Sequence, residues 1–279
     1  MPRLSISSWS LHRALGEVHN HYHATPAPRR DNDNVFGELT LLQLPEKLAA
    51  RGIHTLEICH FHLPSLDDGY LAELRGALAA AGVSLFSILI DDGDITHPDP
   101  AQREADMAWI RGWVAVAGKC GAAKARVIAG QQAAQPANAL SDAPQVQLSA
   151  SQLRSLAAFA QDHGVAIITE NFRELTATAA PLLAILQQCE GQVGLCADFG
   201  NFRGASKYDD LAAILPYADS VHAKAQYVQP GQVEEGDFRR CLGLAKTAVF
   251  DGPYSLIFDG VGNEWANIAV LQGVVGEYV

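Results

Sequence analysis

The chain has 279 residues, of which 48% are apolar and 18% charged, and 31 acidic against 20 basic residues give it a net charge of −11. This length can bury one large core, and no apolar run reaches the ~18–20 residues that span a bilayer, which argues against a membrane protein. Because a negatively charged surface repels a phosphate backbone, the acidic balance also argues against nucleic acid as the main partner.

Eight short apolar runs rich in β-branched residues recur along the chain and predict β-strands at 4–11, 55–61, 84–90, 125–129, 166–170, 193–198, 220–225 and 254–259. Longer stretches of helical period lie between these runs and predict helices, most clearly at 43–51, 70–81, 102–119, 150–162, 179–188 and 238–248. Gly52, Gly82 and Gly164 close three of these helices, where a left-handed cap residue is expected. Apolar strands that alternate with amphipathic helices are typical of a parallel sheet covered by helices.

The number of βα units favours a closed barrel over an open sheet. Eight units in 279 residues match the usual size of such a barrel. An open dinucleotide-binding sheet needs a GxGxxG turn after its first strand, and neither that motif nor a P-loop occurs in the sequence. We therefore predict the α/β fold class, with a single (βα)8 TIM barrel domain over residues 1–279.

Two segments interrupt the regular spacing of these units. Residues 19–34 are polar and contain Pro, and residues 130–149 are rich in Gln, Ala and Pro. Both follow predicted strands, on the face where barrel enzymes bind substrate, so lids over the site and surface loops without a role stay open as alternatives. We expect His19, His21 and His23 in the first segment to be solvated rather than to bind metal.

The N-terminus lacks the apolar core of a secretory signal, and the five cysteines are widely spaced without a CxxC pair. We therefore expect a cytoplasmic protein with reduced cysteines.

Polar residues close four consecutive predicted strands. Glu170 ends the fifth strand, Asp198 the sixth and Asp259 the eighth, while His222 lies near the end of the seventh. Side chains at the carboxyl ends of barrel strands point into the site, and a polar group after an apolar run is costly unless it has a partner or an ion. Carboxylates and an imidazole in register predict a site for a divalent cation such as Mn, Mg, Co or Zn.

The chain resembles the xylose isomerase-like barrels, the superfamily of sugar phosphate isomerases and epimerases that also includes inosose dehydratases and endonuclease IV. Glu170 in ITENF, Asp198 in CADFGN and His222 in SVHAKAQ match the metal ligands that the epimerase branch takes from strands five to seven. The resemblance extends over nearly the whole chain. It implies that Glu170 and the eighth-strand residue, Asp259, are both metal ligands and the acid/base pair.

Two positions depart from this family pattern. Asp259 stands where the family has a Glu, which withdraws the carboxylate by ~1.5 Å, about one C–C bond. Asn201 stands where many epimerases have a His. The shorter carboxylate favours isomerisation or dehydration over epimerisation, because inverting a carbon centre needs an acid on its opposite face.

Further candidates for contact with substrate are Glu57, His60, His62, Lys224 and Asn201. Glu57 lies within the second predicted strand, where an internal ion pair and a substrate contact are equal alternatives. His60 and His62 alternate with the strand period, so we expect them to face one side, toward sugar hydroxyls, with a surface or core role for each as the open alternative. Lys224 could bind an anionic group or stabilise an enolate, or it could pair with a structural carboxylate.

Other polar residues near the strand ends are His12, which could point into the mouth of the barrel, and Asp91 and Asp92, which cap the third strand.

The resulting hypothesis is a divalent-metal-dependent isomerase or epimerase that acts on a sugar or related polyol through a metal-stabilised enediolate. The alternatives are an inosose-type dehydratase and a barrel that binds sugar or metal without turnover. The endonuclease branch is disfavoured by the acidic charge and by the few histidines at strand ends. We expect a small sugar or polyol as the partner, and homo-oligomerisation stays open.

Overall fold

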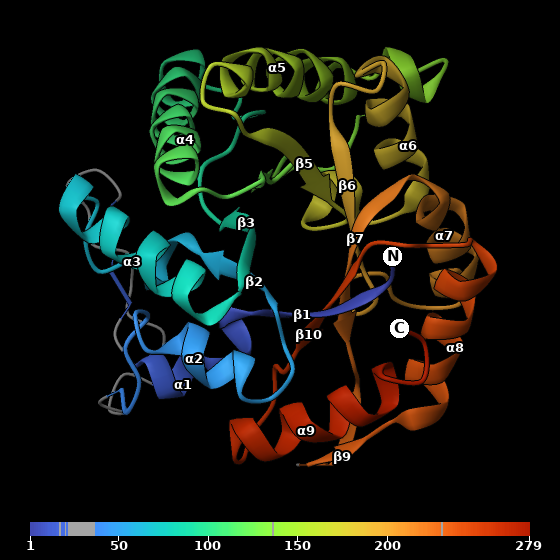
Figure 1. Cartoon of the computed structure of the whole chain (residues 1–279). Coiled ribbons are helices and arrows are strands. Elements are labelled where there is room, and N and C mark those ends of the chain that lie inside the picture. The colour runs from blue at the N-terminus through green and yellow to red at the C-terminus, as the bar shows by residue number, and fades with distance from the viewer. Residues whose placement is uncertain (17, 20, 22–36, 136, 230) are drawn as a thin grey trace.

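Eight parallel strands close into a barrel in the computed structural model, which describes residues 1–16, 18–19, 21, 37–135, 137–229 and 231–279 (Figure 1). The order around the barrel is β1-β10-β7-β6-β5-β4-β3-β2, so the first and last strands pair and leave no open edge. The strands are β1 (Arg3–Ser7), β2 (Thr55–Cys59), β3 (Ser84–Ile90), β4 (Lys124–Val127), β5 (Ala166–Glu170), β6 (Gly194–Asp198), β7 (Ala218–Lys224) and β10 (Pro253–Ile257). The predicted (βα)8 fold is confirmed.

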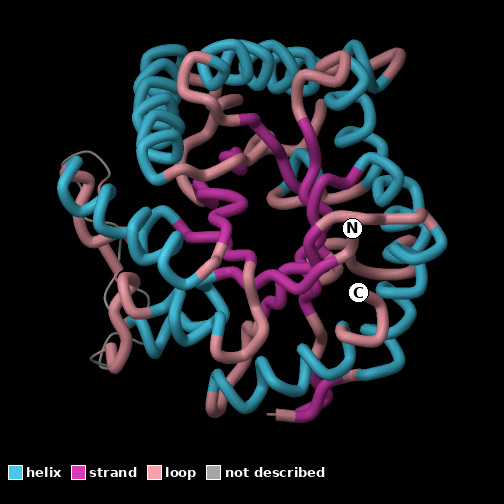
Figure 2. The backbone as a smooth tube through the Cα atoms, in the orientation of Figure 1, coloured by secondary structure: helices cyan, strands magenta, loops and turns pink. Residues whose placement is uncertain are grey.

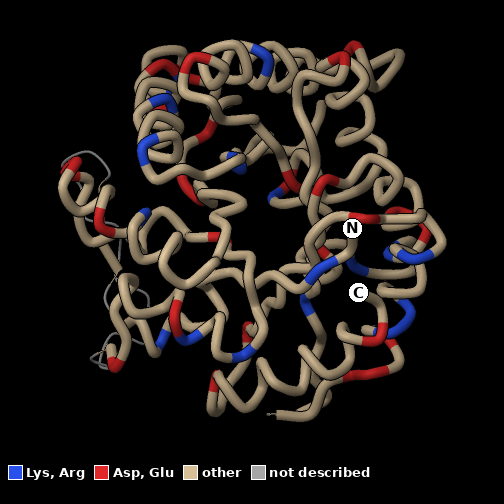
Figure 3. The backbone as a smooth tube through the Cα atoms, viewed as in Figure 1, with Lys and Arg blue, Asp and Glu red and all other residues tan. Residues whose placement is uncertain are grey.

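Helices surround the barrel as an outer ring, which Figure 2 shows in cyan around the magenta strands. They are α1 (His12–Leu15), α2 (Leu44–Ala49), α3 (Asp68–Ala81), α4 (Pro100–Cys120), α5 (Pro144–Gln161), α6 (Ala179–Gln188), α7 (Lys207–Ile214), α8 (Glu235–Thr247) and α9 (Glu264–Val275). A short antiparallel pair, β8 (Tyr227–Gln229) and β9 (Gln232–Val233), follows β7. Acidic and basic positions are interspersed around the outer ring (Figure 3).

The longest helix, α4, illustrates how the sequence sets these elements. Asp99 accepts a hydrogen bond from the backbone N–H of Ala101, Pro100 occupies the first turn, and Gly121 ends the helix at a φ of 76°. Met107, Ile110, Val114 and Ala117 are buried at intervals of three and four residues, so one stripe of the helix packs on the barrel.

The loops after β1 and β2 differ from the sequence-based expectation. β1 ends at Ser7 and continues as a 3₁₀ helix over Ser8–Leu11, because the Ser7 side chain accepts the N–H of Trp9. β2 ends at Cys59, and His60–His62 form a second 3₁₀ helix. The prediction that His60 and His62 alternate along a strand is therefore wrong.

The carboxyl end of the last strand and the segment before α5 also differ from the prediction. β10 ends at Ile257, two residues before the predicted end at Asp259. A 3₁₀ turn (Leu140–Asp142) and the first turn of α5, which begins at Pro144, occupy part of the predicted 130–149 loop, because Pro favours the first turn of a helix. The sequence did not single out α1, α7 or α9.

Within the described ranges, no helix combines the length and apolar character needed to cross a membrane. The 19–34 segment, with its alternatives of lid and surface loop, lies outside the described residues except for 19 and 21, and so does His23.

Candidate active site

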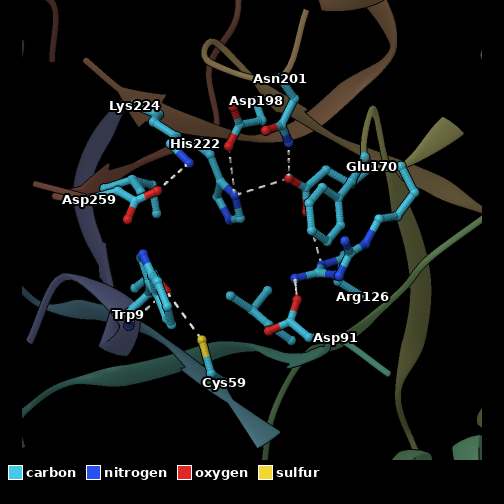
Figure 4. Close-up of a pocket in the computed structure, with 15 residues that line it drawn as sticks. Trp9, Cys59, Asp91, Arg126, Glu170, Asp198, Asn201, His222, Lys224 and Asp259 are labelled. Atoms are coloured by element: carbon cyan, nitrogen blue, oxygen red, sulfur yellow. Dashed lines mark hydrogen bonds and ion pairs between the residues drawn. The ribbon is translucent and has the colours of Figure 1, made fainter. Parts of the chain in front are cut away.

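A cavity of 270 Å³ opens at the carboxyl ends of the strands, just below the ~300 Å³ at which the usual range of small-molecule pockets begins (Figure 4). Every strand of the barrel contributes at least one residue to its wall, so the closed topology brings together residues from the whole length of the chain. The lining residues are Ser7, Trp9, Cys59, Leu89, Asp91, Arg126, Glu170, Phe172, Arg173, Asp198, Asn201, His222, Lys224, Ile257 and Asp259.

Three of the predicted ligands converge in this cavity. His222 Nδ1 lies 3.5 Å from Glu170 Oε1 and 3.6 Å from Asp198 Oδ2. Parallel register accounts for part of this, because Asp198 of β6 is the direct partner of His222 of β7. All three side chains are buried. Glu170 Oε1 and Asp198 Oδ2 thus both lie beside the same imidazole nitrogen.

Neighbouring polar groups fix the two carboxylates. The Asn171 side chain accepts a hydrogen bond from the Asp198 N–H at 2.7 Å and donates one to the Asp198 carbonyl at 2.9 Å. The Gly200 N–H donates to Asp198 Oδ1 at 2.6 Å, which leaves Oδ2 facing His222. Asn201 Nδ2 donates to Glu170 Oε1 at 3.0 Å, so this predicted substrate-binding residue contacts the carboxylate of Glu170.

Glu57 lies beneath the imidazole and is fully buried. Its Oε2 is 3.0 Å from His222 Nε2, so the structure shows the internal ion pair that the sequence left as one alternative. When His222 donates from Nε2 to Glu57, Nδ1 is the nitrogen that faces Glu170 and Asp198. A carboxylate behind a histidine in this way fixes the tautomer and orientation of a metal-binding imidazole.

Arg126 of β4 enters the same site and was missed by the sequence reasoning. Its Nε lies 3.0 Å from Glu170 Oε2, and its Nη2 contacts Asp91 Oδ1. The Nε contact is an ion pair whose angles do not make a hydrogen bond, so within the described part of the chain Glu170 Oε2 is buried without a hydrogen-bond partner. A charged residue within the apolar run KARVIA was the available signal, because an Arg in a buried strand needs an anionic partner.

The charges around Glu170 and His222 stabilise each other. Burial alone would raise the pKa of Glu170, but Arg126, His222 and Lys224 lower it below its ordinary value. Burial would lower the pKa of His222, but Cys196, Glu170 and Glu57 raise it well above its ordinary value. Glu170 is therefore ionised at neutral pH, and a cationic group is favoured beside it.

The donor set fits a divalent cation. Glu170 Oε1 and Asp198 Oδ2 offer two oxygens beside His222 Nδ1, and Glu170 Oε2 is a further buried acceptor. The Cys196 thiol also lies in this group, since ligand atoms of Glu170, Cys196 and His222 lie within 4.8 Å of one another. Carboxylate, imidazole and thiol donors together suit borderline ions such as Zn or Co.

The eighth strand contributes differently from the prediction. Its residue at the wall of the cavity is Ile257, whose register partner in β7 is Lys224. Asp259 follows beyond the end of β10, its side chain 43% exposed, with Oδ2 2.7 Å from Lys224 Nζ. Asp198 and Asp259 raise the pKa of Lys224 against the effect of burial. Asp259 and Lys224 therefore form an ion pair at the mouth of the cavity.

His60 and His62 lie outside the lining of this cavity. His62 Nδ1 is 2.7 Å from Ser8 Oγ, and its Nε2 is 3.1 Å from His12 Nδ1. His60 Nε2 is 3.3 Å from Asp92 Oδ2, and its other nitrogen lies near Leu89 O and the Asp91 N–H. Burial, with His12 and His60 nearby, holds the pKa of His62 well below its ordinary value, so this imidazole is neutral.

Several solved structures share the fold. A zinc-bound IOLI protein superposes with a TM-score of 0.72 at 15% identity, covering 99% of each chain. D-psicose 3-epimerase with D-tagatose from Clostridium cellulolyticum H10 gives 0.69 at 15% identity, covering 99% of this chain and 98% of that one. A xylose isomerase-like TIM barrel protein from Mycobacterium smegmatis in complex with magnesium gives 0.62 at 19% identity, covering 85% and 89%.

A search of curated protein sequences gave no match. The family model for xylose isomerase-like TIM barrels matches residues 45–266, a span that runs from α2 into α9 and includes Glu170, Asp198 and His222. With the eight-stranded barrel and the matching strand-end residues, this chain belongs to the family of xylose isomerase-like TIM barrels.

Proposed function

We propose that the protein is a metal-dependent isomerase or epimerase of a small polyhydroxylated carbonyl compound. The observation that carries this proposal is the convergence of Glu170 Oε1 and Asp198 Oδ2 on His222 Nδ1, at 3.5 and 3.6 Å, with Glu57 behind the imidazole. Similar folds occur in structures named D-psicose 3-epimerase and L-ribulose 3-epimerase, which supports a sugar as substrate.

Glu170, Asp198 and His222 would hold the ion. A divalent ion bound there would polarise a substrate carbonyl and acidify the neighbouring C–H bond. Mn, Mg, Co and Zn are all compatible with the two carboxylates, and the nearby Cys196 thiol favours the softer members of this set.

Glu170 is suited to move the proton. Arg126 keeps its carboxylate ionised, Asn201 holds Oε1, and Oε2 has no hydrogen-bond partner among the described residues. An ionised, positioned carboxylate within reach of a substrate carbon can take a proton and return it to the adjacent carbon on the same face. The cavity volume of 270 Å³ suits a small polyol.

The opposite wall favours chemistry on one face of the substrate. Ile257 presents an apolar side chain where β10 reaches the cavity, while Asp259 is held by Lys224 at the mouth. Inversion of a carbon centre needs a second acid on the opposite face. Aldose–ketose isomerisation is therefore favoured over epimerisation.

Dehydration of a polyol ketone is the second candidate, because the Lys224 ammonium lines the cavity and could protonate a departing hydroxyl.

The test is metal analysis of untagged protein, followed by exchange of substrate C–H hydrogens in deuterated water over a panel of ketoses and inososes. We expect about one divalent ion per chain and metal-dependent deuterium incorporation, both reduced in Asp198→Asn. Asp209→Asn, an acidic residue at the start of α7, is the matched control. Metal binding without exchange on any substrate would instead indicate a binding protein, and absence of metal binding would refute the proposal.

A further inference from the structure

Arg173, three residues beyond Glu170, has a backbone conformation that is almost restricted to glycine. Its φ is 73° and its ψ is 179°. An L-residue in this region is strained, and such strain persists where the surroundings impose it, most often at functional sites. A glycine would fit here without strain. The chain instead has an arginine at this position, which is the largest of the cationic residue types.

Hydrogen bonds close to the strand end impose this conformation. Thr176 is fully buried, and its hydroxyl accepts the Phe172 N–H at 2.9 Å and lies 3.1 Å from the Glu170 carbonyl. The Phe172 N–H is also 2.8 Å from the Glu170 carbonyl. The loop after β5 is therefore pinned directly beside the carboxylate that we assign to proton transfer.

The guanidinium of Arg173 is the least engaged of the arginine and lysine side chains that line the cavity. Arg126 contacts Asp91 and Glu170, and Lys224 contacts Asp259. Among the described residues, Arg173 forms neither a hydrogen bond nor an ion pair. Its contact is with the ring of Phe172, whose centroid lies 4.5 Å from the guanidinium carbon. Stacking on an aromatic ring orients the planar group and leaves its N–H donors available.

We propose that Arg173 binds an anionic group of the substrate, a carboxylate or a phosphate ester carried by the polyol. This inference rests on the proposed function, because it specifies the substrate class of the same site. A guanidinium binds either anion through two parallel hydrogen bonds, and the strained backbone holds it at the cavity wall before substrate arrives.

The test is binding by calorimetry, which does not require turnover. The probes are D-fructose, D-fructose 6-phosphate and D-fructuronate, measured with wild type, Arg173→Gln and Arg203→Gln. Arg203 is exposed and outside the cavity lining, so its variant controls for the loss of one positive charge. We expect wild type and Arg203→Gln to bind one anionic probe roughly tenfold or more tightly than D-fructose, the ratio that one charge-assisted hydrogen bond supplies.

In Arg173→Gln this preference disappears. The anion that shows the preference distinguishes the phosphate from the carboxylate. Equal affinity of wild type for neutral and anionic probes, lack of binding to both anions, or a preference that survives in Arg173→Gln would overturn the inference. Deuterium exchange by wild type that is as efficient on neutral ketoses as on their anionic counterparts would also overturn it, yet leave the proposed function standing. Anion binding without exchange on any substrate would support this inference but contradict the proposed function.

A second variant separates recognition from structure. Arg173→Gly removes both the charge and the strain, so its melting temperature should rise while binding of the anionic probe weakens. A fall in melting temperature together with unchanged binding would show that Arg173 has a structural role instead.

Discussion

Replacing Arg126 by Leu tests the electrostatic basis of the site. The side chain is 4% exposed and contacts two carboxylates, Asp91 and Glu170. Removing one partner of a buried charge pair costs about 3–5 kcal/mol in unfolding free energy, because an uncompensated charge stays behind. Asp91 is 17% exposed and regains some hydration, whereas Glu170 at 4% does not. We therefore expect Arg126→Leu to lower the free energy of unfolding by about 3 kcal/mol, the lower end of this range.

The loss should depend on pH in a defined direction. In wild type the pKa of Glu170 is depressed, so its stabilisation is present above the unfolded value of ~4.3 and is lost as pH falls through the folded value. Without Arg126, the largest of the influences that lower the pKa of Glu170 is gone, so this pKa rises and the carboxyl accepts a proton at higher pH. The difference between wild type and variant should therefore be largest near neutral pH and shrink in acid.

Urea unfolding of the metal-free proteins at about pH 7 and about pH 4 measures both effects. Arg111→Leu is the control, because Arg111 pairs with Glu104 on the surface of α4 at 3.3 Å and should contribute at most about 1 kcal/mol. The double variant Arg126→Leu/Glu170→Gln should recover part of the loss. If Arg126→Leu costs no more than Arg111→Leu, or if the loss grows in acid, the assignment of charges in this site is wrong.

Three other substitutions test the candidate site. Glu57→Gln should weaken metal binding about 10–100-fold with the fold retained, measured by chelator competition, and unchanged affinity would contradict an orienting role for Glu57. Glu170→Gln should abolish metal-dependent deuterium exchange while circular dichroism stays native, so full exchange by this variant would exclude Glu170 as the base. Asp259→Asn should change metal affinity by less than about threefold, because its carboxylate is 43% exposed and paired with Lys224. A loss as large as that in Asp198→Asn would instead make Asp259 a ligand.

The barrel could be predicted from the sequence because the patterns that indicate its strands and helices are local and recur along the chain. Each apolar run and each amphipathic stretch signals one element, and Gly52, Gly82 and Gly164 have the positive φ expected after a helix. Strand-end Glu170, Asp198 and His222 could also be found, since barrel topology places such residues on one face. The ion pair between Glu57 and His222 could not be assigned, because it joins residues 165 positions apart in the sequence.

The N-terminal strands show where pattern reasoning fails. Apolar character continues through Trp9 and Phe61, so the runs look like longer strands. The chain turns earlier because Ser7 caps the next turn and the Ser8 hydroxyl accepts the Cys59 N–H at 2.9 Å. Side chain-to-backbone hydrogen bonds of serine compete with the sheet ladder, and a serine within an apolar run does not reveal which of the two it will join.

The end of the eighth strand was also mispredicted, and here the difference changes the interpretation of the site. The run YSLIFD suggests that Asp259 ends the strand and points into the site as Glu170 and Asp198 do. The ladder with β7 instead ends at Ile257, paired with Lys224, and the chain has left the barrel wall when it reaches Asp259. Lys224 then holds the Asp259 carboxylate at the mouth, and both Asp259 and Ile257 line the cavity. The shortening by one methylene therefore matters less than the two-residue shift beyond the strand, and for this reason we propose Glu170 as the group that moves the proton.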